Sequence, residues 1–210
     1  MNVRHDGDVD DLERCNADPT QIWAPPQRKG LYGGVFKRVL DVVLVLLAAP
    51  VVVPAVAALA LWLARDGRSP FCRETRLGRG GRTFTLWTLR STEPGLPAPI
   101  AEATRLTAFG QMLCRTSLDE LPQLWNVLKG EMSLVGPRPM LPEQKPLYLG
   151  RTCFILRPGL TGLWQVSGRD STSFAERAEL DADYARRLSL ATDLQVLLAT
   201  VSAAVRGKGR

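Results

Sequence analysis

The chain has 210 residues, 45% hydrophobic and 23% charged, with 27 lysines and arginines against 21 acidic residues and a net charge of +6. This length fits one domain with a short appendage, and the composition excludes collagen-like, coiled-coil and wholly disordered chains. The single histidine, His5, stands in a polar N-terminal stretch, which excludes Ser-His-Asp triads and HExxH zinc sites. The four cysteines form no CxxC pair and are predicted to be reduced thiols.

Residues 1–34 are predicted to form a mobile acidic tail. Six acidic residues fall within its first eighteen positions, apolar content is low, and prolines and glycines follow. The negative charge and the late start of the hydrophobic run argue against a signal peptide.

Residues 35–67 are predicted to form a re-entrant membrane segment. No charged residue occurs from Val42 to Ala64, a run long enough to cross a bilayer as a straight helix. Pro50 and Pro54 interrupt its middle, and cations flank both ends, so the positive-inside preference is met best when both ends face the cytoplasm. A straight transmembrane helix and a buried soluble helix remain as alternatives.

A charged motif, Lys37-Arg38-x-x-Asp41, precedes this run. Asp41 is three and four residues from the two cations and falls near the expected start of the helix, where the dipole favours a carboxylate. We interpret Asp41 as a helix-capping residue.

Residues 68–210 are predicted to form a cytoplasmic catalytic domain. Alternation over 71–74 and 83–87, around a glycine-rich loop, predicts a β-hairpin, and apolar periodicity over 101–113, 121–128 and 180–205 predicts helices. The predicted fold class is therefore α+β, mostly helical, with a proline-broken re-entrant membrane helix followed by a small globular domain. The rim of the hairpin carries arginines suited to anionic lipid headgroups or a substrate diphosphate. They are Arg73, Arg76, Arg79, Arg82 and Arg90.

An adjacent acid pair, Asp119-Glu120, stands within the stretch 117–130. One interpretation is structural, because Ser117 and Glu120 have the spacing of a capping box. Pro122 disfavours it and favours a helix that begins near Asp119. At such a helix end the dipole keeps a carboxylate ionised and attracts phosphate, which suits a nucleophile or a magnesium ligand.

Two turn-rich motifs follow the acid pair. In Pro137-Arg138-Pro139 the flanking prolines restrict the backbone, so the guanidinium is directed in a nearly fixed way, as suits a phosphate-binding fork. A solvent-exposed arginine in a turn is the alternative. The stretch 157–169 by itself predicts only a loop with one aromatic residue.

Together these segments resemble one family, the bacterial sugar transferases, which are monotopic polyprenyl-phosphate phosphoglycosyl transferases. The length is that expected of the minimal form of the family, without the extra N-terminal membrane helices of larger relatives. The matching segments are Lys37-Arg38-x-x-Asp41, the proline-broken hydrophobic segment, the hairpin ending Leu89-Arg90-Ser91, Ser117 to Gly130, Gly136-Pro137-Arg138-Pro139, and Arg157-Pro158-Gly159 through Gly168-Arg169.

The resemblance implies transfer of a sugar 1-phosphate from a UDP-sugar to polyprenyl phosphate at the cytoplasmic face of the bacterial inner membrane, with release of UMP. It implies that Asp119 is a nucleophile carrying a covalent phosphosugar, that Glu120 is a second catalytic residue, and that both carboxylates bind Mg²⁺. Membrane lipids and downstream glycosyltransferases are the further partners expected, and nucleic acid is not. The implied substrate-binding residues are Arg90, Arg115, Gln123, Pro137, Arg138, Gln165 and Arg169.

Three positions depart from the family pattern. Thr88 stands where lysine is common, Cys114 where arginine is common, and Val53 where a small polar residue is common. The first two leave open a catalytically degenerate membrane scaffold that binds polyprenyl phosphate or partner enzymes. The stretch 163–169 looks like that of exopolysaccharide-initiating members, for which hexose donors such as UDP-galactose or UDP-glucose are expected.

Overall fold

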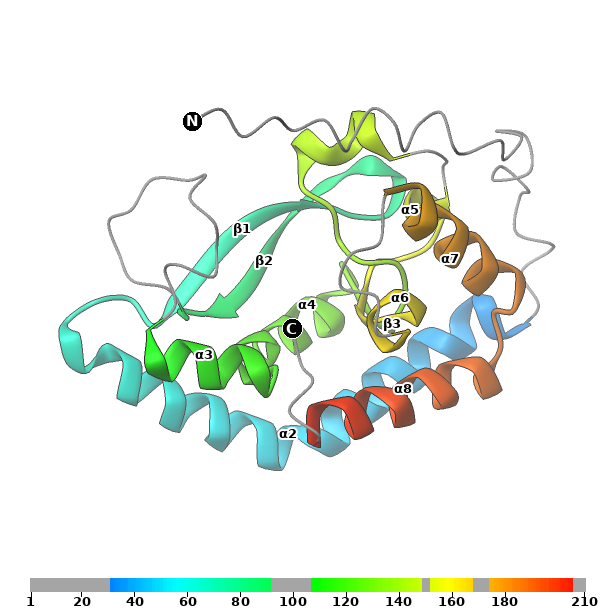
Figure 1. Ribbon diagram of the computed structural model, residues 1–210. Coiled ribbons are helices and arrows are strands. Elements are labelled where there is room, and N and C mark those ends of the chain that lie inside the picture. Colours follow the sequence, from blue (N-terminus) through cyan, green and yellow to red (C-terminus); the bar gives the residue numbers. More distant parts are fainter. Residues whose placement is uncertain (1–30, 92–106, 149–151, 168–173, 206–210) are drawn as a thin grey trace, which may run out of the picture.

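The computed structural model describes residues 31–91, 107–148, 152–167 and 174–205. Residues 1–30 of the predicted acidic tail, 1–34, lie outside it, and the end of that tail forms a 3₁₀ turn, η1 (Leu31–Gly33). Within these ranges helices predominate and the strands form two small sheets, which confirms an α+β, mostly helical fold (Figure 1). The long helix α2 lies along the base of the molecule, and the β-hairpin and the shorter helices lie to one side of it.

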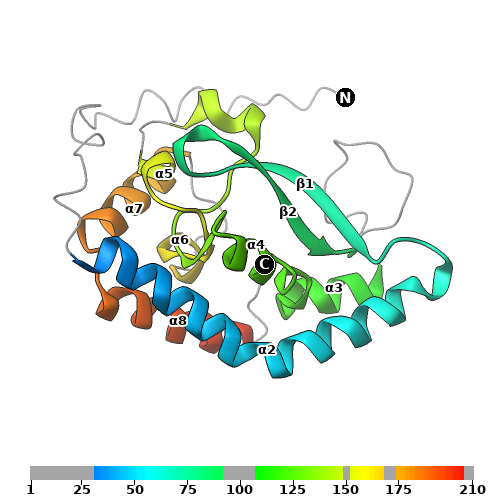
Figure 2. The ribbon, with the colours of Figure 1, turned by 180° about the vertical axis from the view of Figure 1, so that it is seen from behind.

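Helix α2 runs from Val35 to Leu63, between the 3₁₀ turns η1 (Leu31–Gly33) and η2 (Ala64–Asp66). Pro50 and Pro54 fall in its middle, where each lacks the N–H that would bond the carbonyl four residues earlier. The helix bends near its middle into two arms (Figure 2), as proline predicts. Both arms contact the same globular body.

Apolar side chains on α2 are largely exposed. Leu47, Val51 and Leu61 are each more than 70% accessible, and α8 (Leu190–Val205), beside the first arm, exposes Leu198 and Val201. Within the described residues, α2 with η2 is the one helical stretch long and apolar enough to cross a membrane. An exposed apolar surface of this extent is typical of a membrane-associated segment.

The predicted hairpin is confirmed. Strands β1 (Phe71–Leu77) and β2 (Thr83–Leu89) pair antiparallel, with Phe71 opposite Leu89 and Leu77 opposite Thr83. The connection contains η3 (Arg79–Gly81), in which Gly80 has a φ of 74°, a conformation that favours glycine. Of the five rim arginines, Arg73, Arg79 and Arg82 are exposed, whereas Arg76 and Arg90 form ion pairs.

The remaining elements follow the hairpin in the chain. They are α3 (Ala108–Arg115), η5 (Leu118–Glu120), α4 (Gln123–Lys129), β3 (Ser133–Val135), η6 (Pro142–Leu147), α5 (Thr152–Ile155), β4 (Gly159–Thr161), α6 (Leu163–Val166) and α7 (Phe174–Arg186). The helix expected over 180–205 is divided into α7 and α8, because the Ser189 hydroxyl accepts a 3.2 Å bond from the Thr192 amide and so caps α8.

A short parallel sheet joins two motifs that are distant in the sequence. β3 pairs with β4, so the loop that carries Arg138 lies against the backbone that begins at Arg157. A Cβ atom on Gly159 would lie 2.1 Å from the Gly136 nitrogen, which explains why both positions need glycine. This close packing fixes the base of the loop.

The main core connects α2 to the hairpin and to the C-terminal helices. Val45 of α2 packs in one buried cluster with Leu86 of β2, Val127 of α4 and Val196 of α8. The membrane-associated helix is therefore part of the folded domain over its first arm.

The motif Lys37-Arg38-x-x-Asp41 links elements, and its interpretation as helix capping is wrong. Asp41 is 3% exposed and accepts bonds from the Ser133 hydroxyl (2.7 Å) and the Leu134 amide (3.2 Å) of β3. Arg38 donates to the Leu128 carbonyl (2.7 Å). Its positive charge is favourable there, because the C-terminal end of α4 carries the negative end of the helix dipole. The cap position of α2, Gly34, has no side-chain bond.

Candidate active site

The acid pair lies in η5, a single 3₁₀ turn between α3 and α4. Asp119 is 6% exposed and Glu120 is half-buried. Ser117 has a φ of 55°, a left-handed conformation that costs a non-glycine residue roughly 1–2 kcal/mol, and it makes no side-chain cap. The capping-box interpretation is therefore wrong, and the strained turn directly precedes the two carboxylates.

Cys114 contacts the first of these carboxylates. Its Sγ atom lies 3.5 Å from Oδ2 of Asp119 and donates to it. The thiol thus occupies a place beside Asp119 where the family resemblance would lead one to expect arginine. Cys72, Cys114 and Cys153 form no disulfide with one another in the part of the chain that the structure describes.

Two side chains fix the helix that follows the acid pair. The fully buried Asn126 of α4 donates to the Thr85 carbonyl (2.7 Å) and accepts from the Trp87 amide (3.4 Å), both on β2. Arg38 binds the other end of α4 from α2. The acid pair is thus held in a fixed relation to the hairpin and to the membrane-associated helix.

The acid pair suits a magnesium ion whose other ligands are phosphate oxygens of a substrate and water. Within the described ranges, His, Cys, Asp and Glu form no group of three or more that could hold a metal. Magnesium is commonly bound by one or two carboxylates, with substrate phosphates and waters as its other ligands. Asp119 and Glu120 fit that limited role, and they do not fit an all-protein metal cage.

An apolar groove of about 530 Å³ begins next to the acid pair. Leu121 and Pro122, which directly follow Glu120, form one of its walls, and Trp125 lies on the same side. The opposite wall belongs to the bent region of α2, and the hairpin contributes Phe71 and Trp87. The lining residues are Val45, Ala49, Val52, Val53, Val56, Ala57, Phe71, Trp87, Leu121, Pro122, Leu124, Trp125 and Leu128.

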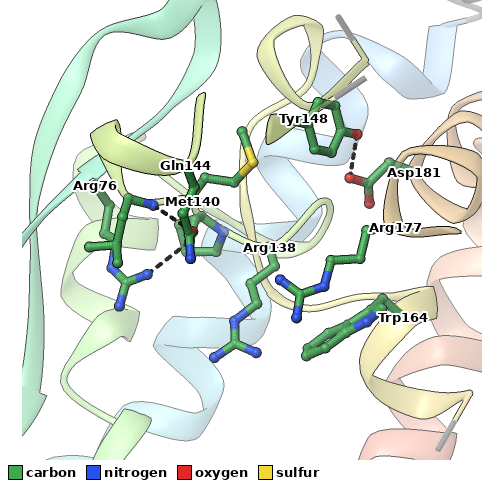
Figure 3. Close-up of a pocket in the computed structure, with 10 residues that line it drawn as sticks. Arg76, Arg138, Met140, Gln144, Tyr148, Trp164, Arg177 and Asp181 are labelled. Carbon is green, nitrogen blue, oxygen red and sulfur yellow. Dashed lines mark hydrogen bonds between the residues drawn. The ribbon is translucent and has the colours of Figure 1, made fainter. Parts of the chain in front are cut away.

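A second cavity, of about 270 Å³, is cationic (Figure 3). Arg138 and Arg177 point into it, and their guanidinium carbons lie 4.8 Å and 4.5 Å from the centroid of the same Trp164 ring. Arg76 enters from β1, where it binds Glu74 and donates to the Pro139 carbonyl at 3.3 Å. The cavity therefore collects three arginines from β1, the loop after β3, and α7.

The one carboxylate among the described residues of this cavity is Asp181, which lies beside Tyr148 (Figure 3). Burial raises the pKa of Asp181 to about 7, although a 2.7 Å bond from the Tyr148 hydroxyl and the charge of Arg177 both act to lower it. Near neutral pH the carboxyl is therefore partly protonated, and it offsets only part of the positive charge of the three arginines.

The predicted substrate-binding residues lie in several places. Arg138 faces the cationic cavity, and Arg90 instead donates to the Leu63 carbonyl (2.8 Å) and to Asp66 at the end of α2. Gln165 has its Oε1 atom buried with no hydrogen-bond partner among the described residues. Of the others, Arg115 is exposed at the end of α3, Gln123 and Pro137 are buried, and Arg169 lies outside the described residues.

Sequence reasoning did not identify Arg177 or Trp164 as site residues. In the sequence Trp164 is only the aromatic residue of a turn-rich stretch, and Arg177 falls in a helix without any local motif. Their role becomes visible only when α6 and α7 are packed beside the loop that carries Arg138.

Similarity to known proteins covers most of the chain. Residues 32–207 match the family of bacterial sugar transferases. The UDP-galactose-lipid carrier transferase of Erwinia amylovora is 37% identical over 82% of this chain, which spans 41% of that relative's length. The exopolysaccharide production protein ExoY of Sinorhizobium fredii is 35% identical, over 94% of this chain and 99% of its own. A UDP-glucose:undecaprenyl-phosphate glucose-1-phosphate transferase of Caulobacter vibrioides is 42% identical, over 79% of this chain and 68% of its own.

Proposed function

The chain belongs to the bacterial sugar transferase family, and on that premise we propose that it transfers a sugar 1-phosphate from a UDP-sugar to polyprenyl phosphate, releasing UMP. The names of the Erwinia and Caulobacter relatives support a UDP-hexose donor and a lipid-phosphate acceptor. The similarity to ExoY supports a role at the start of exopolysaccharide synthesis.

One observation supports this function most directly. The buried carboxylate of Asp119 lies in the turn that leads straight into the apolar groove, since Leu121 and Pro122 belong to the groove wall. A water-soluble transferase needs no such groove beside its acidic residues. An enzyme that acts on polyprenyl phosphate needs one, because the phosphate must reach the carboxylates while the isoprenoid chain stays in an apolar environment.

The proposed reaction has two steps. The Asp119 carboxylate attacks the β-phosphorus of the donor, the bond from that phosphorus to the bridging oxygen breaks, and UMP leaves with the bonding electrons. An oxygen of the lipid phosphate then attacks the same phosphorus, which releases Asp119 and forms a polyprenyl diphosphate sugar. Glu120 and Asp119 would hold magnesium, which supplies positive charge to the phosphate oxygens when bound.

A degenerate scaffold is the second candidate, and it rests on Thr88 and Cys114. Cys114 does contact Asp119, yet its thiol is a weaker donor than the guanidinium expected there. Release of UMP from UDP-glucose or UDP-galactose, in the presence of polyprenyl phosphate and magnesium, separates an enzyme from a scaffold. Absence of UMP from a folded protein with either donor would favour the scaffold.

The apolar groove yields a prediction for the second step. Trp125→Ala removes a side chain that is 58% exposed, so the fold should tolerate the change. The apparent affinity for a long-chain acceptor should fall about tenfold or more, because roughly 1.5–3 kcal/mol of apolar burial is lost. Rapid-quench measurement should still find normal release of UMP in the first step.

Leu147→Ala is the matched control, since Leu147 is equally exposed (56%) but lies in η6, away from the groove. If both variants changed acceptor affinity alike, or if Trp125→Ala impaired only the first step, the groove would not be the acceptor site.

We also propose that α2 enters and leaves the membrane on the cytoplasmic side. Its first arm is bound to Asp193 of α8 through Lys37, and its far end is bound by Arg90, so both ends belong to one domain. A straight span would separate them across the bilayer.

Cysteine labelling tests this topology. In a chain whose four cysteines are replaced by alanine, a cysteine introduced at position 8 or at position 209 should react with an impermeant maleimide only after the cells are opened. Replacing Pro50 and Pro54 by alanine should shift position 8 towards labelling in intact cells, because a straight helix becomes available. Labelling of position 8 alone in intact cells of the parent would show a span.

A further inference from the structure

The cationic cavity holds more positive charge than its own residues neutralise. Arg138 and Arg177 form no ion pair with a carboxylate among the described residues, and Arg76 already shares Glu74. Two guanidinium groups at one indole ring repel each other, since arginine stays protonated at every physiological pH. An anion placed between them would offset that repulsion.

A second observation, at Arg177, also indicates that the cavity binds an anion. Its Nε atom is buried and has no hydrogen-bond acceptor within the described part of the chain. Burial lowers the pKa of Arg177, because the charged form is disfavoured away from water. A buried donor of this kind is costly unless a ligand satisfies it, and the guanidinium fork matches two phosphate oxygens.

The lining of the cavity favours the UDP-sugar over polyprenyl phosphate as its ligand. Arginines, Gln144 and Tyr148 make most of its wall polar, which is unfavourable for an isoprenoid chain. The apolar chain fits the other groove. Phosphates attached to a polar nucleoside and a sugar fit the cationic cavity, and Trp164 keeps both guanidinium groups stacked in place.

We propose that this cavity binds the diphosphate of the nucleotide-sugar donor, with Arg177 and Trp164 as residues that determine donor affinity. Arg177 binds the phosphate oxygens directly, and the Trp164 indole positions Arg177 and Arg138. The assignment rests on the proposed function for its choice of donor, but the cavity can be tested by binding alone.

Isothermal titration with UDP provides the test, because UDP carries the diphosphate without a transferable sugar phosphate. Arg177→Gln should weaken the binding of UDP about 10- to 100-fold, as expected for loss of charged hydrogen bonds. Arg177→Lys should fall between the parent and Arg177→Gln, since it keeps the charge and loses the fork. Trp164→Leu should weaken binding about tenfold.

Arg186→Gln is the matched control. Arg186 lies on the same helix, is exposed and pairs with Asp183, so its loss removes the same net charge without touching the cavity. Unchanged affinity for UDP in Arg177→Gln, or an equal loss in Arg186→Gln, would overturn the proposal. So would a loss of affinity for farnesyl phosphate in Arg177→Gln while UDP still binds normally.

Chemical protection covers the case in which a variant does not fold. In the parent protein, UDP should protect Arg177 from phenylglyoxal, as read by peptide mass spectrometry, and should leave Arg186 reactive. Equal modification of Arg177 with and without UDP would refute the site.

If UDP protects Arg177 but no sugar phosphate is ever transferred, the site stands and the proposed function fails. If transfer proceeds and Arg177→Gln keeps the parent's KM for the UDP-sugar, only the site fails.

Discussion

Asp119→Asn is expected to abolish the release of UMP from a UDP-sugar, in the absence as well as the presence of lipid acceptor. The amide has nearly the same shape as the carboxylate but cannot attack phosphorus, so the first step has no nucleophile. In a rapid-quench experiment the parent should release about one UMP per enzyme in a burst, and the variant none. Steady-state turnover should fall by a factor on the order of 10⁴ or more.

Mass spectrometry gives an independent measure of the same step. The parent mixed with donor alone should gain the mass of a phosphosugar on the peptide that contains Asp119, and Asp119→Asn should gain nothing. Glu120→Gln should retain some of this adduct while turnover falls severely, because a magnesium ligand or a base is lost.

A purely structural acid pair makes a different prediction. Asp119 is buried beside Cys114, so the Asp119→Asn change would then lower the free energy of unfolding by about 1 kcal/mol and leave turnover largely intact. Near-normal release of UMP by folded Asp119→Asn would therefore remove the covalent mechanism. Thermal unfolding of both proteins in the same detergent supplies the folding control.

Local sequence patterns were sufficient to predict the hairpin, the bend in the long helix and the approximate place of the acid pair. Alternation around Gly78, Gly80 and Gly81 predicted the hairpin, and the uncharged run with two prolines predicted a bent helix. The acid pair was expected at the start of a helix, and it lies one turn earlier, in η5, because Pro122 is the residue that precedes α4. Each of these features depends on residues that are close together in the chain.

Long-range contacts could not be predicted in the same way. Asp41 has the position of a capping residue, and only the packing of α2 against β3 shows that it binds Ser133, 92 residues away. Arg177 and Arg138 share Trp164 although they are 39 positions apart in the sequence. Local periodicity carries no information on such pairs, because it reports only which face of an element is apolar.

Removal of the Asp193 carboxylate should strongly destabilise the fold. Asp193 is 2% exposed and lies in α8, where its carboxylate accepts bonds from Lys37 (2.5 Å), Tyr32 (2.6 Å) and Tyr184 (2.6 Å). These partners come from η1, α2 and α7, so one carboxylate joins the membrane-associated helix to the two C-terminal helices. Burial raises the pKa of Tyr184, which therefore stays protonated and donates to Asp193.

Asp193→Ala should lower the free energy of unfolding by about 3–5 kcal/mol, since the partly buried Lys37 ammonium and Tyr32 hydroxyl lose their acceptor and Tyr184 keeps only its 3.1 Å bond to the Val135 carbonyl. For a chain of this size the loss corresponds to a fall in Tm of roughly 6–20 °C. Thermal unfolding in detergent, followed by circular dichroism, measures it. Asp183→Ala is the control: the ion pairs of Asp183 among the described residues are with the exposed Arg186 and Arg187, so this change should cost no more than about 1 kcal/mol.

The double variant Lys37→Met/Asp193→Leu separates the loss of an ion pair from the loss of packing. It removes both charges and keeps apolar bulk between α2 and α8, so it should recover a large part of the stability that Asp193→Ala loses. The recovery should be incomplete, because the Tyr32 hydroxyl still lacks the acceptor that the carboxylate provided and Tyr184 keeps only the longer bond to the Val135 carbonyl. A double variant as unstable as Asp193→Ala would mean that α8 is held to α2 by the hydroxyl bonds and the shape of this contact, and that the buried charge pair contributes little.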